Sequence, residues 1–398
     1  MNTKYRKLSV CAALVAATAA AVAIYPSLRT AATQTVTGTQ TSTARKAVEV
    51  VFVLDTTGSM SGLIAAAKEK IWSIASTMAQ ADPAPEIRMG LVAYRDRGDA
   101  YVTRVVDLSG DLDTMYATLM DFAADGGGDT PESVNQALGD AFERISWSQD
   151  ASTYKVVFLV GDAPPHMDYF EDRRYPEILA AAAQRGIVVN TIQCGGMPET
   201  TQTWNEIARL GGGRYFQVDQ AGGALAIATP FDAEIAELSA ELDSTRLYYG
   251  TVEERAAMHS KVEATDKLHE LASDAARARR GVFNATASGL VNLLGENELV
   301  DAVANGRVDL AAIPASELPE PLRDLEPAAQ QAAIDDLAQK REELQGRITA
   351  LAGQRVQFIA DEVAATPAAP SSLDEQIYET VRDQAKAVGL EYNEGPAY

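Results

Sequence analysis

The sequence predicts an α/β fold: a doubly wound, mainly parallel sheet with one antiparallel edge strand, followed by an α-helical C-terminal region. Continuous β-branched runs at residues 48–54 and 154–160 are typical of strands that are buried on both faces. Between residues 46 and 220 such runs alternate with segments whose apolar residues recur at helical spacing. Beyond residue 220 this alternation stops, and the 398 residues are enough for two or three domains.

The elements of the first half follow one another closely. Strands are expected over residues 48–54, 86–94, 101–106, 154–160, 187–193 and 214–218. Helices are expected up to about residue 81 and over residues 112–123, 132–145, 175–185 and 201–210. Only a short polar turn, residues 95–100, separates the second strand from the third. Such a turn can join only antiparallel neighbours, so it predicts the edge hairpin.

The first 45 residues have the pattern of an export segment. Lys4, Arg6 and Lys7 precede the apolar residues 8–25, as in the basic and apolar regions of a signal peptide. Eighteen apolar residues are also close to the shortest membrane span, so an uncleaved signal anchor is the alternative. We therefore expect a signal peptide or anchor over residues 1–25, a Thr-rich linker over 26–45, and an exported body in the periplasm, at the cell surface or secreted.

Charge and cysteine content exclude several classes of protein. The chain has 34 Lys and Arg against 56 Asp and Glu, and the six charges of residues 1–46 are all basic, which leaves −28 on the rest. Such a body repels phosphate backbones and anionic lipids, so we expect no nucleic-acid partner and membrane contact through the N-terminal segment only. Cys194 is the one thiol of the body, so a fold held by intrachain disulfides is excluded.

Five oxygen-bearing side chains are expected at one edge of the sheet. Asp55, Thr57 and Ser59 follow the first strand, and Asp162 follows the fourth. Thr130 comes from the glycine-rich loop before the next helix. If the two strands flank the point where the strand order reverses, these side chains converge there. Two carboxylates and three hydroxyls form a hard, all-oxygen site that suits Mg²⁺ or Mn²⁺.

This pattern resembles a site of known type. Asp-x-Thr-x-Ser at residues 55–59, then Thr130 and Asp162, is similar to the metal-ion-dependent adhesion site of von Willebrand factor type A (VWA) domains, with Thr57 in place of the first Ser. The resemblance covers residues 46–220, and the glycine-rich segments also resemble an exported bacterial subgroup with a helical C-terminal extension. It implies a non-enzymatic binding module whose cation bridges to an acidic side chain of a protein partner.

Other interpretations of the same residues stay open. Asp55, Thr57 and Ser59 would also serve to cap the helix that follows them. A Mg²⁺-dependent hydrolase or phosphotransferase would use the same ion, but residues 55–59 lack the second Asp of a DxDxT phosphatase pattern and the sequence places no general base. A third alternative is a structural scaffold that assembles through the helical half.

The C-terminal half is expected to be helical over residues 221–365, with a linker and a terminal helix over 366–398. A long helix is expected over 327–365, where four apolar residues repeat every seven positions: Leu337, Leu344, Leu351 and Phe358. A second row lies three residues before these positions, and there Arg341 and Arg355 replace every other apolar residue. This helix therefore packs on the chain's own surface or associates with a second copy as a coiled coil.

Overall fold

The computed structural model describes residues 45–62, 64–128, 130–218, 227–365, 373–393 and 395. Residues 45–398 form one compact unit. The signal segment and almost all of the Thr-rich linker lie outside the described residues. Every helix within the described residues is too short or too polar to span a bilayer.

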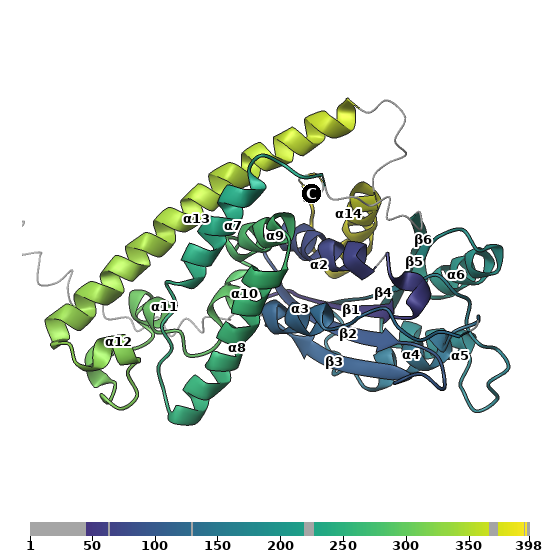
Figure 1. Ribbon diagram of the computed structural model, residues 1–398, viewed down its shortest axis with the longest axis horizontal. Helices are drawn as coiled ribbons and strands as arrows, with labels where there is room; N and C mark the ends of the chain where they lie inside the picture. Colours follow the sequence, from purple (N-terminus) through teal and green to yellow (C-terminus); the bar gives the residue numbers. More distant parts are fainter. Residues whose placement is uncertain are drawn as a thin grey trace, which may run out of the picture. The chain divides into compact units, whose positions relative to one another are not determined.

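Six strands form a single sheet in the order β3–β2–β1–β4–β5–β6 (Figure 1). Their bounds are β1 Ala47–Asp55, β2 Glu86–Tyr94, β3 Thr103–Ser109, β4 Tyr154–Gly161, β5 Ile187–Cys194 and β6 Gly212–Val218. β3 is antiparallel to β2 and all other neighbours are parallel, which confirms the predicted fold class and its edge hairpin. The carboxyl ends of β1 and β4 lie side by side at the point where the strand order reverses.

Helices cover both faces of this sheet. Their bounds are α2 Ile64–Ala79, α3 Leu112–Met120, α4 Val134–Glu143, α5 Tyr175–Gln184, α6 Pro198–Leu210 and α14 Leu373–Ala385. Side chains alternate along a strand, so Val50 and Phe52 of β1 pack with α2, α3 and α14, whereas Val51 and Val53 pack with α4, α5 and α6. Because both faces are covered, the strands appear in the sequence as uninterrupted apolar runs.

Two helices begin at other residues than expected, for local reasons. The helix expected from residue 132 begins at Val134, because the Glu132 backbone bonds to the loop after β4: its N–H donates to the Pro164 carbonyl at 3.0 Å. The helix expected from residue 201 begins at Pro198, since the first turn of a helix needs no N–H from that residue.

The terminal helix α14 is part of the α/β layers. Ile377 and Val381 are buried in the same core cluster as the strand residues of β1. The Tyr154 hydroxyl donates to Gln384 Oε1 at 2.6 Å, and the amides of Gln384 and Asn190 bond to each other at 2.9 and 3.2 Å. The helical segment between β6 and α14 is therefore an insertion before the last helix of the α/β domain.

Shortening a buried side chain of α14 tests this assignment. We expect Ile377→Ala to lower the free energy of unfolding by about 2–5 kcal/mol, because it opens a cavity against the sheet. Urea denaturation measures the change. Glu379→Ala, on the exposed side of the same helix, is the control and should change little. Equal stability of the two variants would contradict a core role for α14.

The inserted region consists of helices with the bounds α7 Asp232–Asp243, α8 Val252–Leu271, α9 Asp274–Asn284, α10 Leu290–Leu294, α11 Leu299–Ala304, α12 Glu320–Arg323 and α13 Pro327–Ala364. α13, expected over 327–365, packs against α7, α9 and α11. Arg341 forms two 3.0 Å bonds to the Glu298 carboxylate, and Arg355 bonds to Asp232 at 2.8 Å. The charges that interrupt the apolar row are thus buried and paired within the chain. Self-association through this helix stays a prediction.

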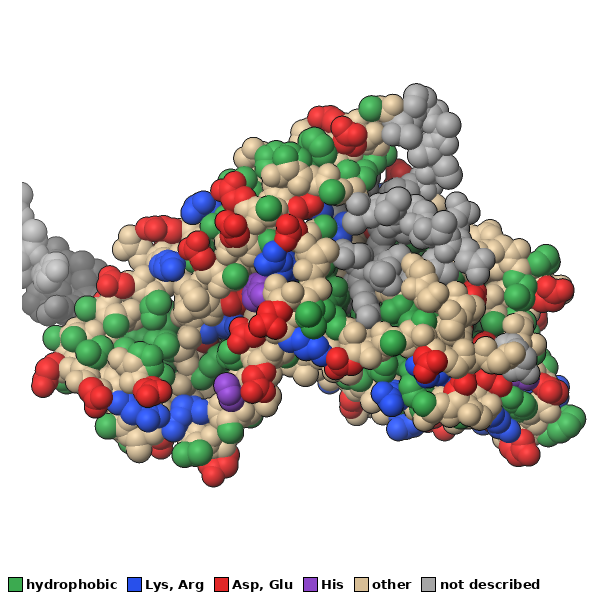
Figure 2. Space-filling view, viewed as in Figure 1, with side chains coloured by type: hydrophobic (Ala, Val, Ile, Leu, Met, Phe, Trp, Pro, Cys, Tyr) green, Lys and Arg blue, Asp and Glu red, His purple; other side chains and the backbone are tan. Residues whose placement is uncertain are grey.

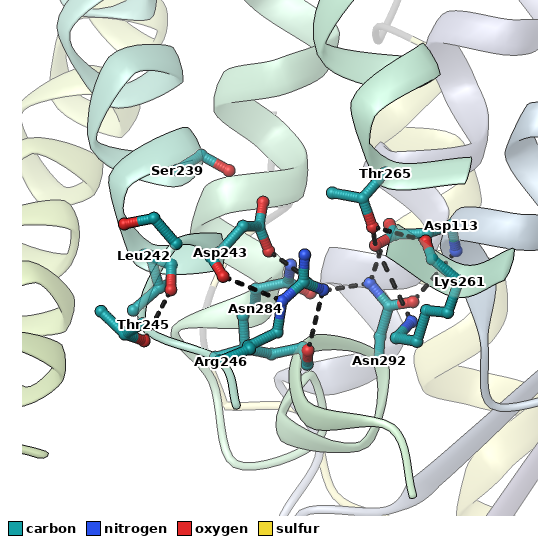
Figure 3. A network of polar contacts seen from close by, with 12 residues as sticks. Asp113, Ser239, Leu242, Asp243, Thr245, Arg246, Lys261, Thr265, Asn284 and Asn292 are labelled. Carbon is teal, nitrogen blue, oxygen red and sulfur yellow. Dashed lines mark hydrogen bonds and ion pairs between the residues drawn. The ribbon is translucent and has the colours of Figure 1, made fainter. Parts of the chain in front are cut away.

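A buried ionic network joins the inserted region to α3. Arg280 of α9 donates to Asp113 of α3 at 2.5 and 2.7 Å and to Asp243 of α7 at 2.6 and 3.0 Å. Figure 3 shows Asp113 facing Lys261 and Thr265 of α8 and Asn292 of α10. Burial opposes ionisation, but the Arg280 charge outweighs it, holding the pKa of Asp113 well below its ordinary value and that of Asp243 at about 2.

Removing the central cation of this network should be costly. Arg280→Met keeps much of the volume but leaves Asp113 and Asp243 buried without their main counter-charge, so we expect a loss of about 3–5 kcal/mol in unfolding free energy. Urea denaturation at neutral pH measures it. Arg347→Met, on α13, removes an exposed ion pair with Glu234 of α7 and is expected to cost little. Similar costs for both variants would contradict the role of the network.

Candidate metal centre

Four of the five predicted ligands form one chain of hydrogen bonds. Asp55 Oδ1 accepts bonds from the N–H and the hydroxyl of Thr57, at 2.9 and 2.7 Å. The hydroxyls of Thr57 and Ser59 are 3.1 Å apart, and Ser59 donates to Asp162 Oδ1 at 3.0 Å. The structure therefore brings Asp55, Thr57, Ser59 and Asp162 together across the ends of β1 and β4.

The fifth residue, Thr130, is exposed at the start of the segment that leads into α4. No contact between its side chain and the other four is seen in the described part of the chain. Asp129 beside it lies outside the described residues. The role of Thr130 therefore stays a prediction.

Glycines let the surrounding loops approach closely. The Gly58 N–H donates to the Gly126 carbonyl at 3.1 Å, and a Cβ on Gly58 would lie 3.0 Å from that same oxygen. Gly126 and Gly127 both have positive φ, at 75° and 71°, a conformation that favours glycine. The Asp99 carboxylate accepts the Gly127 N–H at 3.1 Å and so holds the glycine-rich loop beside the Asp55–Ser59 turn.

Helix capping does not account for Thr57. It precedes a short 3₁₀ helix, Gly58–Met60, but its side chain makes no capping bond there. The hydroxyl instead bonds to the neighbouring site residues. Within the described contacts, these side chains are arranged around one another rather than around a helix terminus.

The two carboxylates are buried whereas part of the site is open. Asp55 is fully buried and Asp162 is 8% exposed, but Ser59 lies at the surface. Asp55 Oδ2 has no hydrogen-bond partner although it is buried. Burial raises the pKa of Asp55 to about 7 and also raises that of Asp162. Because an unpaired buried carboxylate is costly, a cation bound here would stabilise both charges.

This donor set fits a hard cation that keeps bound water. Among the described residues, no three carboxylate, histidine or cysteine side chains are close enough to hold a metal by themselves. A cation at Asp55 and Asp162 would therefore take hydroxyl oxygens and water as its other ligands. Mg²⁺ and Mn²⁺ accept such mixed oxygen sets, and Mg²⁺ usually retains several waters.

Neighbouring residues that the ligand pattern does not include hold the loops in place. Asp96, after β2, accepts the hydroxyls of Ser133 and Tyr169 at 2.7 and 2.8 Å. His166 is buried, stacks on Tyr169 with ring centres 4.0 Å apart, and bonds to Asp168 at 2.8 Å. The loop after Asp162 is thereby fixed to the edge hairpin. His166 is part of this support.

Comparison with known proteins identifies the family of the α/β region. Residues 49–230 match the family described as von Willebrand factor A domain. These residues form a VWA domain. Such domains are commonly metal-dependent protein-interaction modules.

Several solved structures also resemble the VWA domain. The SpRpn10 VWA domain is 14% identical and covers 47% of this chain and 96% of its own, with a TM-score of 0.35. Proximal thread matrix protein 1 from the mussel byssus, with a zinc-occupied MIDAS motif, is 14% identical over 44% of this chain and 42% of its own (TM-score 0.34). A von Willebrand factor type A structure from Catenulispora acidiphila is 22% identical over 44% and 39% (TM-score 0.32).

A curated relative, an ariadne-like RING finger protein of Acanthamoeba polyphaga mimivirus, is 26% identical over 119 residues. The match takes in 30% of this chain and 11% of that protein. The chain therefore spans only about a tenth of that relative's length.

The raised pKa of Asp55 predicts a pH-dependent site. The folded domain binds the proton of the Asp55 carboxyl group more tightly than the unfolded chain does. The free energy of unfolding of the metal-free domain should therefore fall as the pH rises from 3.8 to about 7. A cation must displace the same proton, so Mn²⁺ affinity should fall by up to about tenfold for each pH unit below 7. Calorimetric titration and thermal unfolding between pH 5 and 8.5 measure both trends. A pH-independent affinity would contradict them.

Proposed function

We propose that this chain is an exported protein whose VWA domain holds a protein partner through a divalent cation, Mg²⁺ or Mn²⁺. The ion is bound by Asp55, Thr57, Ser59, Thr130 and Asp162 and bridges to an acidic side chain of the partner. The observation that carries the proposal is the chain of hydrogen bonds between four of these residues. At one end of this chain, Asp55 Oδ2 is buried and has no hydrogen-bond partner.

The donor types favour a bridging ion. Hydroxyl ligands bind a cation without neutralising it, so the ion retains the positive charge to attract a further carboxylate. The acidic body opposes an acidic partner at long range, but physiological salt screens charges beyond about 8 Å. Figure 2 shows acidic side chains spread over one face with Lys and Arg between them, which limits the local repulsion.

The surroundings of the site favour a macromolecular ligand over a small substrate. Two cavities that are lined by described residues, of about 680 and 500 Å³, lie in the helical region, mainly along residues 290–307 and 338–345, and neither of these two includes a site residue. Small substrates are usually enclosed in concave pockets, whereas Ser59 and Thr130 lie at the surface. This favours a binding module over the hydrolase alternative.

The export part of the proposal is supported by the sequence alone. Three basic residues before an apolar stretch of 18 residues are typical of a signal segment, and the linker that follows would tether or release the body. Protease accessibility of the body in intact and permeabilised cells tests this part independently of the metal.

Metal titration tests the site. We expect the purified chain to bind Mg²⁺ and Mn²⁺, and Asp55→Asn and Asp162→Asn each to weaken binding by at least about tenfold while circular dichroism stays unchanged. Asp125→Asn, on an exposed carboxylate of the neighbouring loop, is the matched control and should bind as the parent does.

A pull-down with and without EDTA then tests the partner. The proposal predicts proteins that are retained with Mg²⁺, are lost with EDTA, and are absent with Asp55→Asn. Equal metal binding by all variants, together with an identical set of retained proteins under both conditions, would contradict it.

A further inference from the structure

We propose that Glu132 is a third carboxylate of the cation site, acting on the ion through a bound water. This inference rests on the proposed function, because it needs the cation at Asp55 and Asp162. The ligand pattern does not include Glu132, which is predicted from the sequence as an ordinary residue at the start of a helix.

Glu132 is buried without a polar partner for its outer carboxylate oxygen. The residue is 2% exposed, and Glu132 Oε2 makes no hydrogen bond. No Lys or Arg pairs with it among the ion pairs of the described residues. A carboxylate in this condition is unfavourable unless a cation or a donor reaches it.

The side chain points toward the site. A Cβ placed on Gly127 would lie 2.9 Å from Thr57 Cβ and 3.2 Å from Glu132 Oε1, so both side chains face the same glycine. The Glu132 backbone is fixed on both sides, since its N–H donates to the Pro164 carbonyl and its carbonyl accepts the His166 N–H, each at 3.0 Å. This junction joins the glycine-rich loop, α4 and the loop after Asp162.

Glu132 belongs to a cluster of carboxyl groups, and only some of these groups have hydrogen-bond donors for their oxygens. Four carboxylates lie close enough to repel it: Asp55, Asp96, Asp99 and Asp162. Asp96 and Asp99 are satisfied by hydroxyl and backbone donors. Glu132 Oε2 and Asp55 Oδ2 remain without one. These two carboxylate oxygens thus lie in one cluster, where a single cation with its water would serve both.

A water-mediated contact is the form that fits the spacing. Asp55, Asp162 and Glu132 are not close enough together to hold one ion directly. A small cation that keeps part of its hydration shell presents water hydrogens to such a carboxylate. Carboxylates that bond to the ligands of a metal typically contribute 10–100-fold to its affinity.

The test is a titration of the full chain with Mn²⁺. Electron paramagnetic resonance measures the free Mn²⁺ and so gives the affinity. We expect Glu132→Gln, which removes the charge at nearly constant shape, to weaken Mn²⁺ binding by about 10–100-fold with unchanged circular dichroism. Glu132→Asp, which keeps the charge on a shorter arm, should restore part of the loss. Glu171→Gln, an exposed carboxylate in the loop after β4, is the matched control and should bind as the parent does.

The outcomes separate this inference from the proposed function. Parent-like Mn²⁺ affinity of Glu132→Gln, together with lost binding by Asp55→Asn, would overturn the role of Glu132 and leave the proposed function intact. Parent-like binding by both would overturn both. If Glu132→Gln fails to fold, Glu132→Ala is measured in its place, and parent-like affinity of that variant overturns the inference equally.

Discussion

The Asp55 carboxylate lies fully buried at the end of the central strand β1, with one oxygen held by Thr57 and the other unpartnered. Other features of the site depend on this constraint. The loops after β1 and β4 and the loop before α4 converge on this point, and a charge on Asp55 is costly there unless a cation or a donor reaches it. The glycines of the α4 loop permit that approach, and the Asp99 contact to Gly127 holds it.

The α/β layers of this chain are discontinuous in sequence. The family match ends at residue 230, yet α14 packs against α2 and β6. A helical segment of well over a hundred residues is therefore inserted before the last helix. Its attachment to α3 depends on a buried arginine between two buried aspartates, an arrangement that is strongly destabilised when one partner is lost. The helical region is consequently anchored to the same layer of helices that covers one face of the sheet.

The acidic body is compatible with the candidate cation site. Surface carboxylates are solvated and screened, so they act mainly on solubility and on the approach of partners. The carboxylates at the ends of β1 and β4 are buried, so solvent and salt screen their charges less. A cation at Asp55 and Asp162 would therefore interact more strongly with these two carboxylates than with the solvated carboxylates of the described surface.

The sequence by itself determined the sheet, its edge hairpin and the meeting of Asp55, Thr57, Ser59 and Asp162, because strand burial and the ends of parallel strands follow from local patterns. Only the tertiary structure decided the place of α14, the pairing of Arg341 and Arg355 within the chain, and the position of Glu132 beside Thr57. These depend on contacts between residues far apart in the chain. Periodicity shows that a helix has a face to bury, but which surface covers that face is set by the packing of the whole molecule.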